Sequence, residues 1–252
     1  MIVANMATFP AREGTLRAAV EALLPQVDRL NLCLNEYKSI PDWVETLDAV
    51  HAEIPAVDLK DLGKFMFDVS PEDDVILVDD DILYPGDYVQ KAIDQRNKAE
   101  VSVGKPVVGG FHGTIYLRRS LIRFAKDVIK GRGLKAPHFG RAKILHAFHD
   151  HLARPRIVAQ LGTGTVVTKG SLLPSLDYMM GAERRADVRF ARWCVDQGYT
   201  QIALPRAKDW MPASENDAEA IYETYTQNLP KEFLEELSLF AFRVPQIGKY
   251  IG

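Results

Sequence analysis

The sequence is poor in cysteine, with only Cys33 and Cys194 in 252 residues and no paired spacing between them. This argues against a disulfide framework and against a cysteine-based zinc site. No apolar run approaches the roughly 18–20 residues that a membrane-spanning helix needs, so we expect no transmembrane segment. The net charge of −3 gives no overall basic character, and we therefore expect no nucleic-acid partner.

The start of the chain also lacks the features of a signal peptide. In MIVANMATFPAR no basic stretch precedes an apolar core, so this segment predicts a first strand. Together with the scarcity of cysteine, it leads us to expect a cytoplasmic protein. With 47% hydrophobic and 26% charged residues, the composition is that of one globular domain spanning residues 1–252.

Segments with strand character alternate with segments that have the apolar spacing of helices. Predicted strands lie at 2–7, 29–34, 75–78, 101–108, 156–168 and 200–204. Predicted helices lie at about 15–24, 87–98, 184–197, around Tyr222 and Tyr225, and at 230–242. This alternation predicts an α/β fold with a mostly parallel central sheet flanked by helices.

Three consecutive carboxylates, Asp79, Asp80 and Asp81, follow the apolar run at 75–78 in VILVDDDILYP. Two unit charges about 4 Å apart repel by roughly 4 kcal/mol at an effective dielectric near 20, so a positive group is expected beside them. In parallel sheets, ligands bind at the carboxyl ends of strands, where these aspartates fall. If the strand continues through the motif, Asp79 and Asp81 point to one side, about 6.5–7 Å apart at Cα, and can share Mg²⁺ or Mn²⁺ with a phosphate ligand.

The acidic motif is also compatible with different kinds of protein. An exposed acidic turn would need no ion, and an EF-hand is disfavoured because the twelfth position from Asp79 is Gln90. Phosphatases of the haloacid dehalogenase type normally carry Asp-x-Asp after the first strand, whereas at least two strands precede it here. A nucleotidyltransferase would be expected to have a glycine-rich basic loop after its first strand, and ATFPAREG is a poor one. A catalytically silent carbohydrate-binding subunit would not need the acidic triad.

The chain resembles the bacterial heparosan capsule α-1,4-N-acetylglucosaminyltransferases, which are GT-A glycosyltransferases. The segments that carry the resemblance run in order from residue 2 to about 210: VANMATFPAR, QVDRLNLCLNEY, DLGKF, VDDDILYPGDYV, GGFHG, RPRIVAQLGTGTV, ADVRFAR and PRAKDW. The resemblance implies a GT-A-like domain with a DxD motif at a strand end, a nucleotide-binding half at about 1–110 and an acceptor-binding half at about 111–252. It also implies retaining, metal-dependent transfer of GlcNAc from UDP-GlcNAc to the 4-hydroxyl of a terminal glucuronate. A partner glucuronosyltransferase is implied as well, with peripheral association at the inner membrane through that partner.

The resemblance assigns the donor side of the site to residues near the first strand and the acidic motif. Asp81 becomes the main ligand of Mn²⁺ or Mg²⁺, Asp79 assists it, and Asp79 and Asp80 bind the ribose. The nucleotide-binding residues are Thr8, Pro10, Arg12, Lys64, Asp79 and Asp80. Without the resemblance, Arg12 and Lys64 would be explained equally well as surface cations.

On the sugar side, Gly162, Thr163, Gly164 and Thr165 are expected to offer exposed backbone and hydroxyl groups to sugar hydroxyls, although glycine in a strand also marks a bulge. Trp210 could stack on a sugar ring or simply pack.

Three residues are assigned to catalysis: Asp187, Arg206 and Lys208. Asp187 would orient the acceptor or stabilise positive charge at the anomeric carbon, but an aspartate in a first helical turn is common for dipole reasons alone. The cations of Arg206 and Lys208 suit a departing diphosphate. His112 is a candidate further metal or phosphate contact, and its alternative is a structural histidine.

A basic segment lies in the second half of the chain. Residues 118–156 contain eleven lysines and arginines and two aspartates, a net charge of +9, so the rest of the chain carries −12. The glycines among these cations predict a loop at about 118–153. An anionic oligosaccharide or polysaccharide acceptor is a natural partner for it, while anionic lipid or nucleic acid would suit the same charge.

Overall fold

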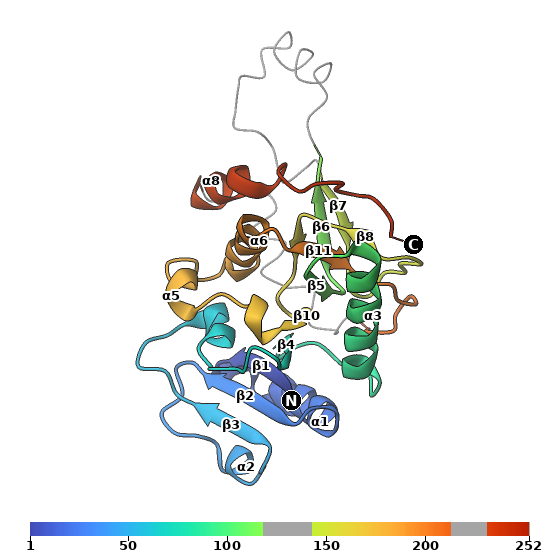
Figure 1. Ribbon diagram of the computed structural model, residues 1–252. Coiled ribbons are helices and arrows are strands. Elements are labelled where there is room, and N and C mark those ends of the chain that lie inside the picture. Colours follow the sequence, from blue (N-terminus) through green and yellow to red (C-terminus); the bar gives the residue numbers. More distant parts are fainter. Residues whose placement is uncertain (118–142, 213–230, 252) are drawn as a thin grey trace, which may run out of the picture.

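The computed structural model describes residues 1–117, 143–212 and 231–251 (Figure 1). Its centre is an eight-stranded sheet with the order β3-β2-β1-β4-β10-β5-β11-β8, and a three-stranded sheet has the order β7-β6-β9. The strands are β1 Ile2–Thr8, β2 Arg29–Leu34, β3 Val50–Glu53, β4 Asp74–Asp79, β5 Val107–Gly110, β6 Gly113–Tyr116, β7 Lys143–His146, β8 Arg156–Ile157, β9 Gln160–Leu161, β10 Thr165–Lys169 and β11 Thr200–Ala203.

The helices join these strands and cover the sheet. They are α1 Glu13–Leu23, α2 Asp42–Glu45, α3 Tyr88–Val103, α5 Leu176–Met179, α6 Ala186–Gln197 and α8 Lys231–Phe240. Short 3-10 helices lie at Pro10–Arg12 (η1), Leu24–Gln26 (η2), Lys60–Phe65 (η3) and Gly170–Leu172 (η5).

Strand pairing in the large sheet is parallel on one side and mixed on the other. Strands β1, β2, β3 and β4 pair in parallel, as do β5 and β11, whereas β10 is antiparallel to both β4 and β5. The prediction of an α/β fold with a large, mostly parallel central sheet flanked by helices is therefore confirmed. The two predicted halves share this sheet, because β8, β10 and β11 from beyond residue 111 join the strands of the first half.

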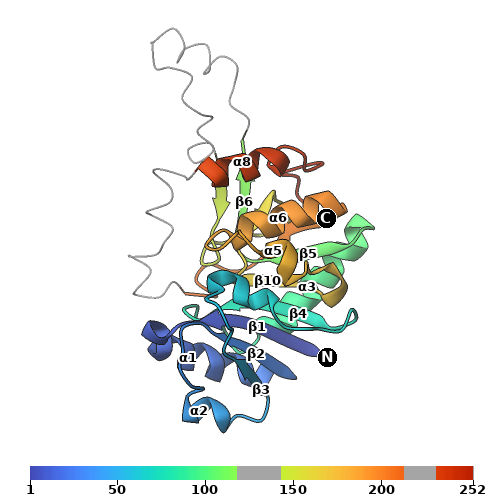
Figure 2. The same cartoon turned by 90° about the vertical axis from the view of Figure 1, so that its left-hand side faces the viewer.

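Apolar side chains on both faces of the sheet explain which elements cover it. The helices α1 and α3 pack on one face, against alternate residues such as Met6, Leu32 and Ile76. On the other face η3, α5 and α6 pack against residues that include Val75 and Leu77 (Figure 2). β4 is buried from both sides, which accounts for its continuous apolar run.

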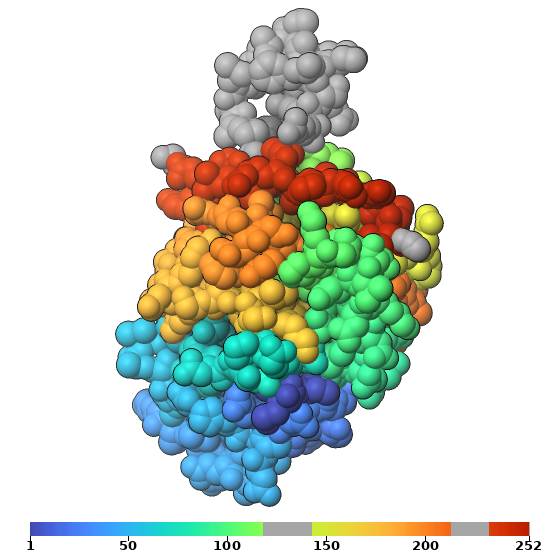
Figure 3. All heavy atoms as spheres, viewed as in Figure 1, coloured from blue at the N-terminus to red at the C-terminus, as the bar shows by residue number. Residues whose placement is uncertain are grey.

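The C-terminal segment forms an outer layer on α6. Helix α8 lies over α6, and the residues after it run on toward β8, where Tyr250 forms a β-bridge with Arg156 (Figure 3). The carboxylate of Glu236, which is 5% exposed, forms an ion pair with Arg189 of α6. Leu237 and Phe240 of α8 pack against Val188 and Ala191. No helix among the described residues is both long enough and apolar enough to cross a membrane.

Most predicted elements are present, and two predictions need correction. The strand predicted at 101–108 is wrong for residues 101–103, which form the end of α3; Gly104 ends that helix at a positive φ of 67°, and β5 starts only at Val107. The segment 156–168 is divided among β8, β9 and β10. The predicted helix around Tyr222 and Tyr225 lies outside the described residues, as does the part of the predicted basic loop at 118–142.

Candidate active site

The acidic motif lies where β4 ends beside β1. Because Ala7 pairs with Asp79 across these parallel strands, Thr8 reaches Asp80, and its hydroxyl donates a hydrogen bond of 2.6 Å to Asp80 Oδ2. The following turn η1 carries Arg12, whose Nη1 lies 2.9 Å from Asp80 Oδ1 and also forms an ion pair with Asp81. Pro10 opens this turn and has an exposed side chain.

The extended geometry assumed for the motif is not present. β4 ends at Asp79, and Asp80 and Asp81 form a turn. Asp80 and Asp81 therefore share the guanidinium of Arg12, while Asp79 forms an ion pair with Lys64. Two protein cations thus supply part of the positive charge that the three adjacent carboxylates require.

Lys64 is the buried cation of the site, with 2% of its surface exposed. Gly63 lets η3 approach the sheet, since a Cβ at this position would overlap the side chain of Cys33. The amide of Asn5 donates a hydrogen bond of 2.9 Å to the carbonyl oxygen of Lys64. Burial lowers the pKa of Lys64, but the nearby charges of Asp79, Asp187 and Asp61 outweigh burial and raise it. Lys64 therefore stays protonated.

Tyr84, which the sequence did not single out, and Gly164 hold Asp79 in place. The backbone N–H of Asp79 donates to the hydroxyl of Tyr84 at 2.8 Å, and this hydroxyl donates to the carbonyl oxygen of Gly164 at 2.7 Å. Gly164 was predicted as a sugar contact, but a Cβ at this position would overlap the carboxylate of Asp79. The segment DDDILYP shows that a tyrosine closely follows the end of the strand, which is only a weak signal of its role. Nothing in that segment indicates that its hydroxyl bonds to Gly164, beside β10.

Asp187 lies in the first turn of α6, the position that the sequence predicted, and its carboxylate lies beside Thr163. Its Oδ1 accepts hydrogen bonds from the backbone N–H of Thr163 at 2.8 Å and from the Thr163 hydroxyl at 2.6 Å. The ammonium of Lys64 lies 3.4 Å from the carbonyl oxygen of Thr163. Among the described residues no hydrogen bond reaches Oδ2 of Asp187.

Negative charge exceeds positive charge in this cluster. Six ionisable side chains meet here, four carboxylates and two cations: Asp79, Asp80, Asp81, Asp187, Lys64 and Arg12. When all are ionised the net charge of these six is −2. Burial raises the pKa of Asp81 to about 6, and the charges of Asp79 and Asp80 add to the shift while Arg12 opposes it. Burial also raises the pKa values of Asp80 and Asp187, with Asp79 contributing in both.

A divalent cation would offset this net charge. Asp81 and Asp79 are the residues that could hold it, since their side chains are 32% and 39% exposed. Within the described residues, no three His, Cys, Asp or Glu side chains are grouped so that they could hold a metal ion. Such an ion would therefore need oxygen ligands from a bound molecule, as Mg²⁺ commonly does when it bridges carboxylates and phosphates.

The hydroxyls of the LGTGTV segment are not exposed, which corrects the expectation that they are offered to a sugar. Thr163 and Thr165 are 3% and 1% exposed. The Thr165 hydroxyl accepts the backbone N–H groups of Phe111 at 3.1 Å and His112 at 3.0 Å, and Gly162 donates to the carbonyl oxygen of His112 at 2.9 Å. These groups join β10 to the turn between β5 and β6.

Arg206 and Lys208, the two cations assigned to the departing diphosphate, do not lie in one site. Arg206 is buried and donates to the carbonyl oxygens of Phe148 at 3.1 Å, Leu204 at 2.9 Å and Ala147. Burial lowers the pKa of Arg206 to about 10. Lys208, in contrast, is exposed. The geometry of Arg206 is that of a residue that organises backbone, so its predicted contact with a diphosphate gains no support.

Trp210 and His112 lie in packed surroundings. The indole N–H of Trp210 donates to Asp87 at 2.9 Å, Lys91 lies over its ring at 4.0 Å, and the ring contacts Phe111. Trp210 is thus a packing residue in this structure. Burial and the charge of Arg206 lower the pKa of His112 to about 4, so its ring is neutral near pH 7. The described residues do not bring His112 together with two further metal ligands.

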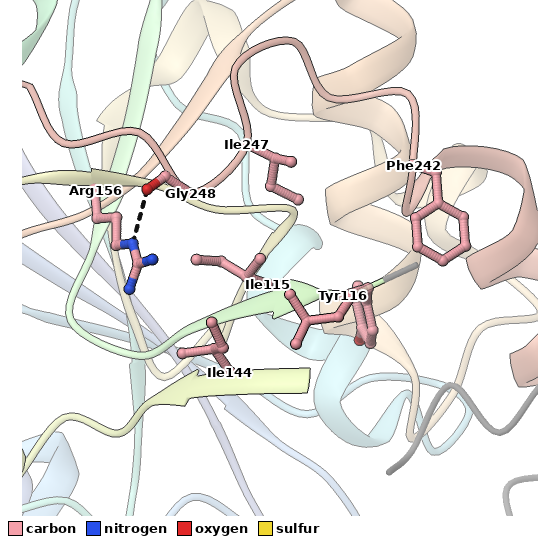
Figure 4. Close-up of a pocket in the computed structure, with 8 residues that line it drawn as sticks. Ile115, Tyr116, Ile144, Arg156, Phe242, Ile247 and Gly248 are labelled. Atoms are coloured by element: carbon pink, nitrogen blue, oxygen red, sulfur yellow. Dashed lines mark hydrogen bonds between the residues drawn. The ribbon is translucent and has the colours of Figure 1, made fainter. Parts of the chain in front are cut away.

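A hollow of about 330 Å³ lies away from the acidic cluster. Ile115, Ile144 and Ile247 line it from β6, β7 and the C-terminal segment, with Arg156 at one end (Figure 4). Nε of Arg156 donates to the carbonyl oxygen of Gly248 at 2.9 Å. None of the residues that line this hollow belongs to the acidic cluster, so it is not the candidate active site.

Comparisons with known proteins add little beyond this geometry. No family model matches the sequence, and no curated protein matches it. Among solved structures, the mannose-6-phosphate isomerase from Helicobacter pylori is similar over 82% of this chain and 87% of that chain, with 14% sequence identity and a TM-score of 0.36. A similarity at this level does not indicate a function.

Proposed function

We propose that the protein is a retaining, metal-dependent GT-A glycosyltransferase that moves GlcNAc from UDP-GlcNAc to the terminal glucuronate of a heparosan-like polysaccharide. The observation that carries the proposal is the cluster of four carboxylates and two cations at the carboxyl end of β4. This is the edge of the sheet at which α/β proteins bind nucleotides. The resemblance of the sequence to the heparosan transferases supplies the donor and the acceptor.

The donor half of the site would use residues from β1, η3 and β4. Asp80 is 4% exposed, and Thr8 and Arg12 bind its two oxygens, so a contact with the ribose would have to share one of these hydrogen bonds. A Mn²⁺ or Mg²⁺ ion, held by Asp81 and Asp79, would act as a Lewis acid that offsets the charge of the diphosphate. Lys64 pairs with Asp79, so that only part of the acidic charge is left for the ion.

The sugar half of the site would use Asp187. One of its oxygens is held by Thr163, which leaves Oδ2 for the acceptor hydroxyl or the anomeric carbon. Transfer would break the bond between that carbon and the diphosphate oxygen and form a bond to the acceptor oxygen, whose proton would pass to the departing diphosphate. A carboxylate beside this carbon would stabilise the positive charge that develops on it.

The acceptor would be recognised by charge. The sequence of residues 118–156 carries a net charge of +9, and a uronate polymer carries one negative charge per disaccharide. We expect Arg or Lys to Ala changes at 118–143 to raise the KM for the acceptor and to leave UDP binding unchanged. A partner glucuronosyltransferase would add the alternate sugar, in the cytoplasm and at the inner membrane.

The decisive experiment offers a panel of UDP-sugars and a glucuronate-terminated heparosan oligosaccharide to the protein, with Mn²⁺ and then with EDTA. GlcNAc addition that EDTA abolishes supports the donor, the acceptor and the metal together. UDP-GlcNAc hydrolysis without addition would retain the donor and exclude this acceptor. Release of phosphate from a phosphomonoester, with no use of any UDP-sugar, would favour a phosphatase instead.

A further inference from the structure

The short helix η3 connects the two halves of the site. Two of its side chains, three positions apart, reach in different directions: Lys64 pairs with Asp79 at the end of β4, and Asp61 reaches the start of α6. The carboxylate of Asp61 accepts the backbone N–H groups of Arg184 at 2.6 Å and Ala186 at 3.0 Å. Asp187 follows directly, so Asp61 contacts the turn that presents Asp187.

The local sequence of α6 does not supply this contact itself. The residue at the N-cap is Arg185, which makes no side-chain capping hydrogen bond, and Arg184 has a positive φ of 64°. The first N–H groups of a helix lack partners inside the helix, and a carboxylate is their preferred external partner. Asp61 thus provides, from more than 120 residues earlier in the chain, the cap that the segment ERRAD lacks.

Buried asparagines fix η3, and hence Asp61, to the sheet. Asn5 donates to the carbonyl oxygen of Lys64 at 2.9 Å, and Asn31 donates to Asn5 at 2.8 Å. At the other end of η3, Asn35 donates to the carbonyl oxygen of Lys60 at 3.0 Å and accepts the N–H of Leu59 at 2.9 Å. All three asparagines are at most 3% exposed, so this anchor is shielded from water.

We propose that Asp61 is a positioning residue that sets the place of Asp187 relative to Asp79. The contacts form a closed ring: Asp61 binds the turn before Asp187, Asp187 binds Thr163, Thr163 lies against Lys64, and Lys64 and Asp61 share η3. Loss of Asp61 opens the ring on the side of Asp187 and leaves the pair of Lys64 and Asp79 intact. This inference rests on the proposed function for its catalytic consequence.

The test compares Asp61→Ala and Asp61→Asn with the parent protein, and uses Asp58→Asn as a matched control. Asp58 lies just before η3 and accepts from the N–H of Lys60 at 2.9 Å, without contact to α6. We expect kcat for GlcNAc transfer to fall at least tenfold in Asp61→Ala, less in Asp61→Asn, which keeps one acceptor oxygen, and not in Asp58→Asn. The dissociation constant of UDP with Mn²⁺ should change less than threefold in all variants.

Amide hydrogen exchange provides a measurement that does not depend on transfer. In Asp61→Ala, exchange should accelerate more than tenfold at 184–187 and stay unchanged at 74–79. Unchanged exchange at 184–187, or an equal loss of UDP affinity and kcat, would overturn the proposal. If the parent protein transfers no sugar, the proposed function fails, and the exchange at 184–187 still decides whether Asp61 positions Asp187.

Discussion

The hydroxyl of Tyr84 donates a hydrogen bond of 2.7 Å to the carbonyl oxygen of Gly164 and accepts one of 2.8 Å from the N–H of Asp79. One phenol thereby joins the end of β4 to the residue that precedes β10, at the point where the acidic motif begins. Tyr84 is 5% exposed, so water cannot replace its hydroxyl easily.

Tyr84→Phe should lower the free energy of unfolding by about 1–3 kcal/mol, because it leaves a buried N–H and a buried carbonyl oxygen without their partner. Urea denaturation measures this loss. The control is Tyr88→Phe on the adjacent ring, whose buried hydroxyl has no hydrogen-bond partner among the described residues. We expect little change there. Equal losses in both variants would show that the two hydrogen bonds of the Tyr84 hydroxyl do not contribute measurably to stability.

Gly164→Ala should disable the site, because the added Cβ overlaps the carboxylate of Asp79. Overpacking of this kind costs about 1–3 kcal/mol in unfolding free energy, and we expect metal-dependent UDP binding to weaken at least tenfold. Calorimetric titration with UDP and Mn²⁺ measures the affinity. Gly14→Ala in α1, where no atom lies within 4 Å of the new Cβ, is the control. Parental affinity in Gly164→Ala would show that the position of Asp79 does not matter.

Asp81→Asn should separate activity from stability. It removes one of three adjacent negative charges. We therefore expect the free energy of unfolding of the metal-free protein at pH 7 to rise by about 1 kcal/mol. Transfer and Mn²⁺-dependent UDP binding should be lost. Asp94→Asn, at an exposed position on α3, should change neither. Transfer near the parent rate in Asp81→Asn would exclude Asp81 as a metal ligand.

His112 should contribute a loss of stability in mild acid, opposite in sign to the contribution of Asp81, whose pKa is raised to about 6. Burial lowers the pKa of His112 to about 4, against 6.5 for the ordinary side chain, so the unfolded chain binds a proton that the folded protein rejects. The contribution is therefore complete above pH 6.5 and is lost as the pH falls toward 4, by about 2–3 kcal/mol. Denaturation between pH 4 and 7 in metal-free buffer should show a shallower slope for His112→Gln than for the parent. His51→Gln on the edge strand β3 is the control, and an identical slope in all three proteins would contradict the assignment.

The parts of the fold that follow from local pattern could be predicted from the sequence. The apolar run of β4 and the alternation of β2 are strong signals, and they placed the three aspartates at the carboxyl end of a central strand. The pairing of Asp79 with Lys64 could not be predicted, because it depends on how η3 docks on the sheet through Asn5 and Asn35.

The direction in which side chains point could not be predicted from the sequence either. Thr163 and Thr165 alternate with glycines and suggested hydroxyls offered to a ligand, yet both turn inward to bind Asp187 and backbone N–H groups. Arg206 follows a strand as an exposed cation would, but three carbonyl oxygens draw it into the protein. These orientations are set by contacts between residues that are far apart in the sequence. No short segment of sequence contains both residues of such a contact.

Because β10 lies between β4 and β5, the central sheet can be completed only after residues 165–169 have been synthesised. Residues 165–169 form the strand between β4 and β5, so a nascent chain that ends near residue 110 has an open edge on each of these strands. Open edges pair readily with other chains, and the acidic cluster still lacks Gly164 and Asp187 at that stage. The complete cluster, with Gly164 beside Asp79 and Asp187 beside Thr163, therefore forms only after most of the chain has been synthesised.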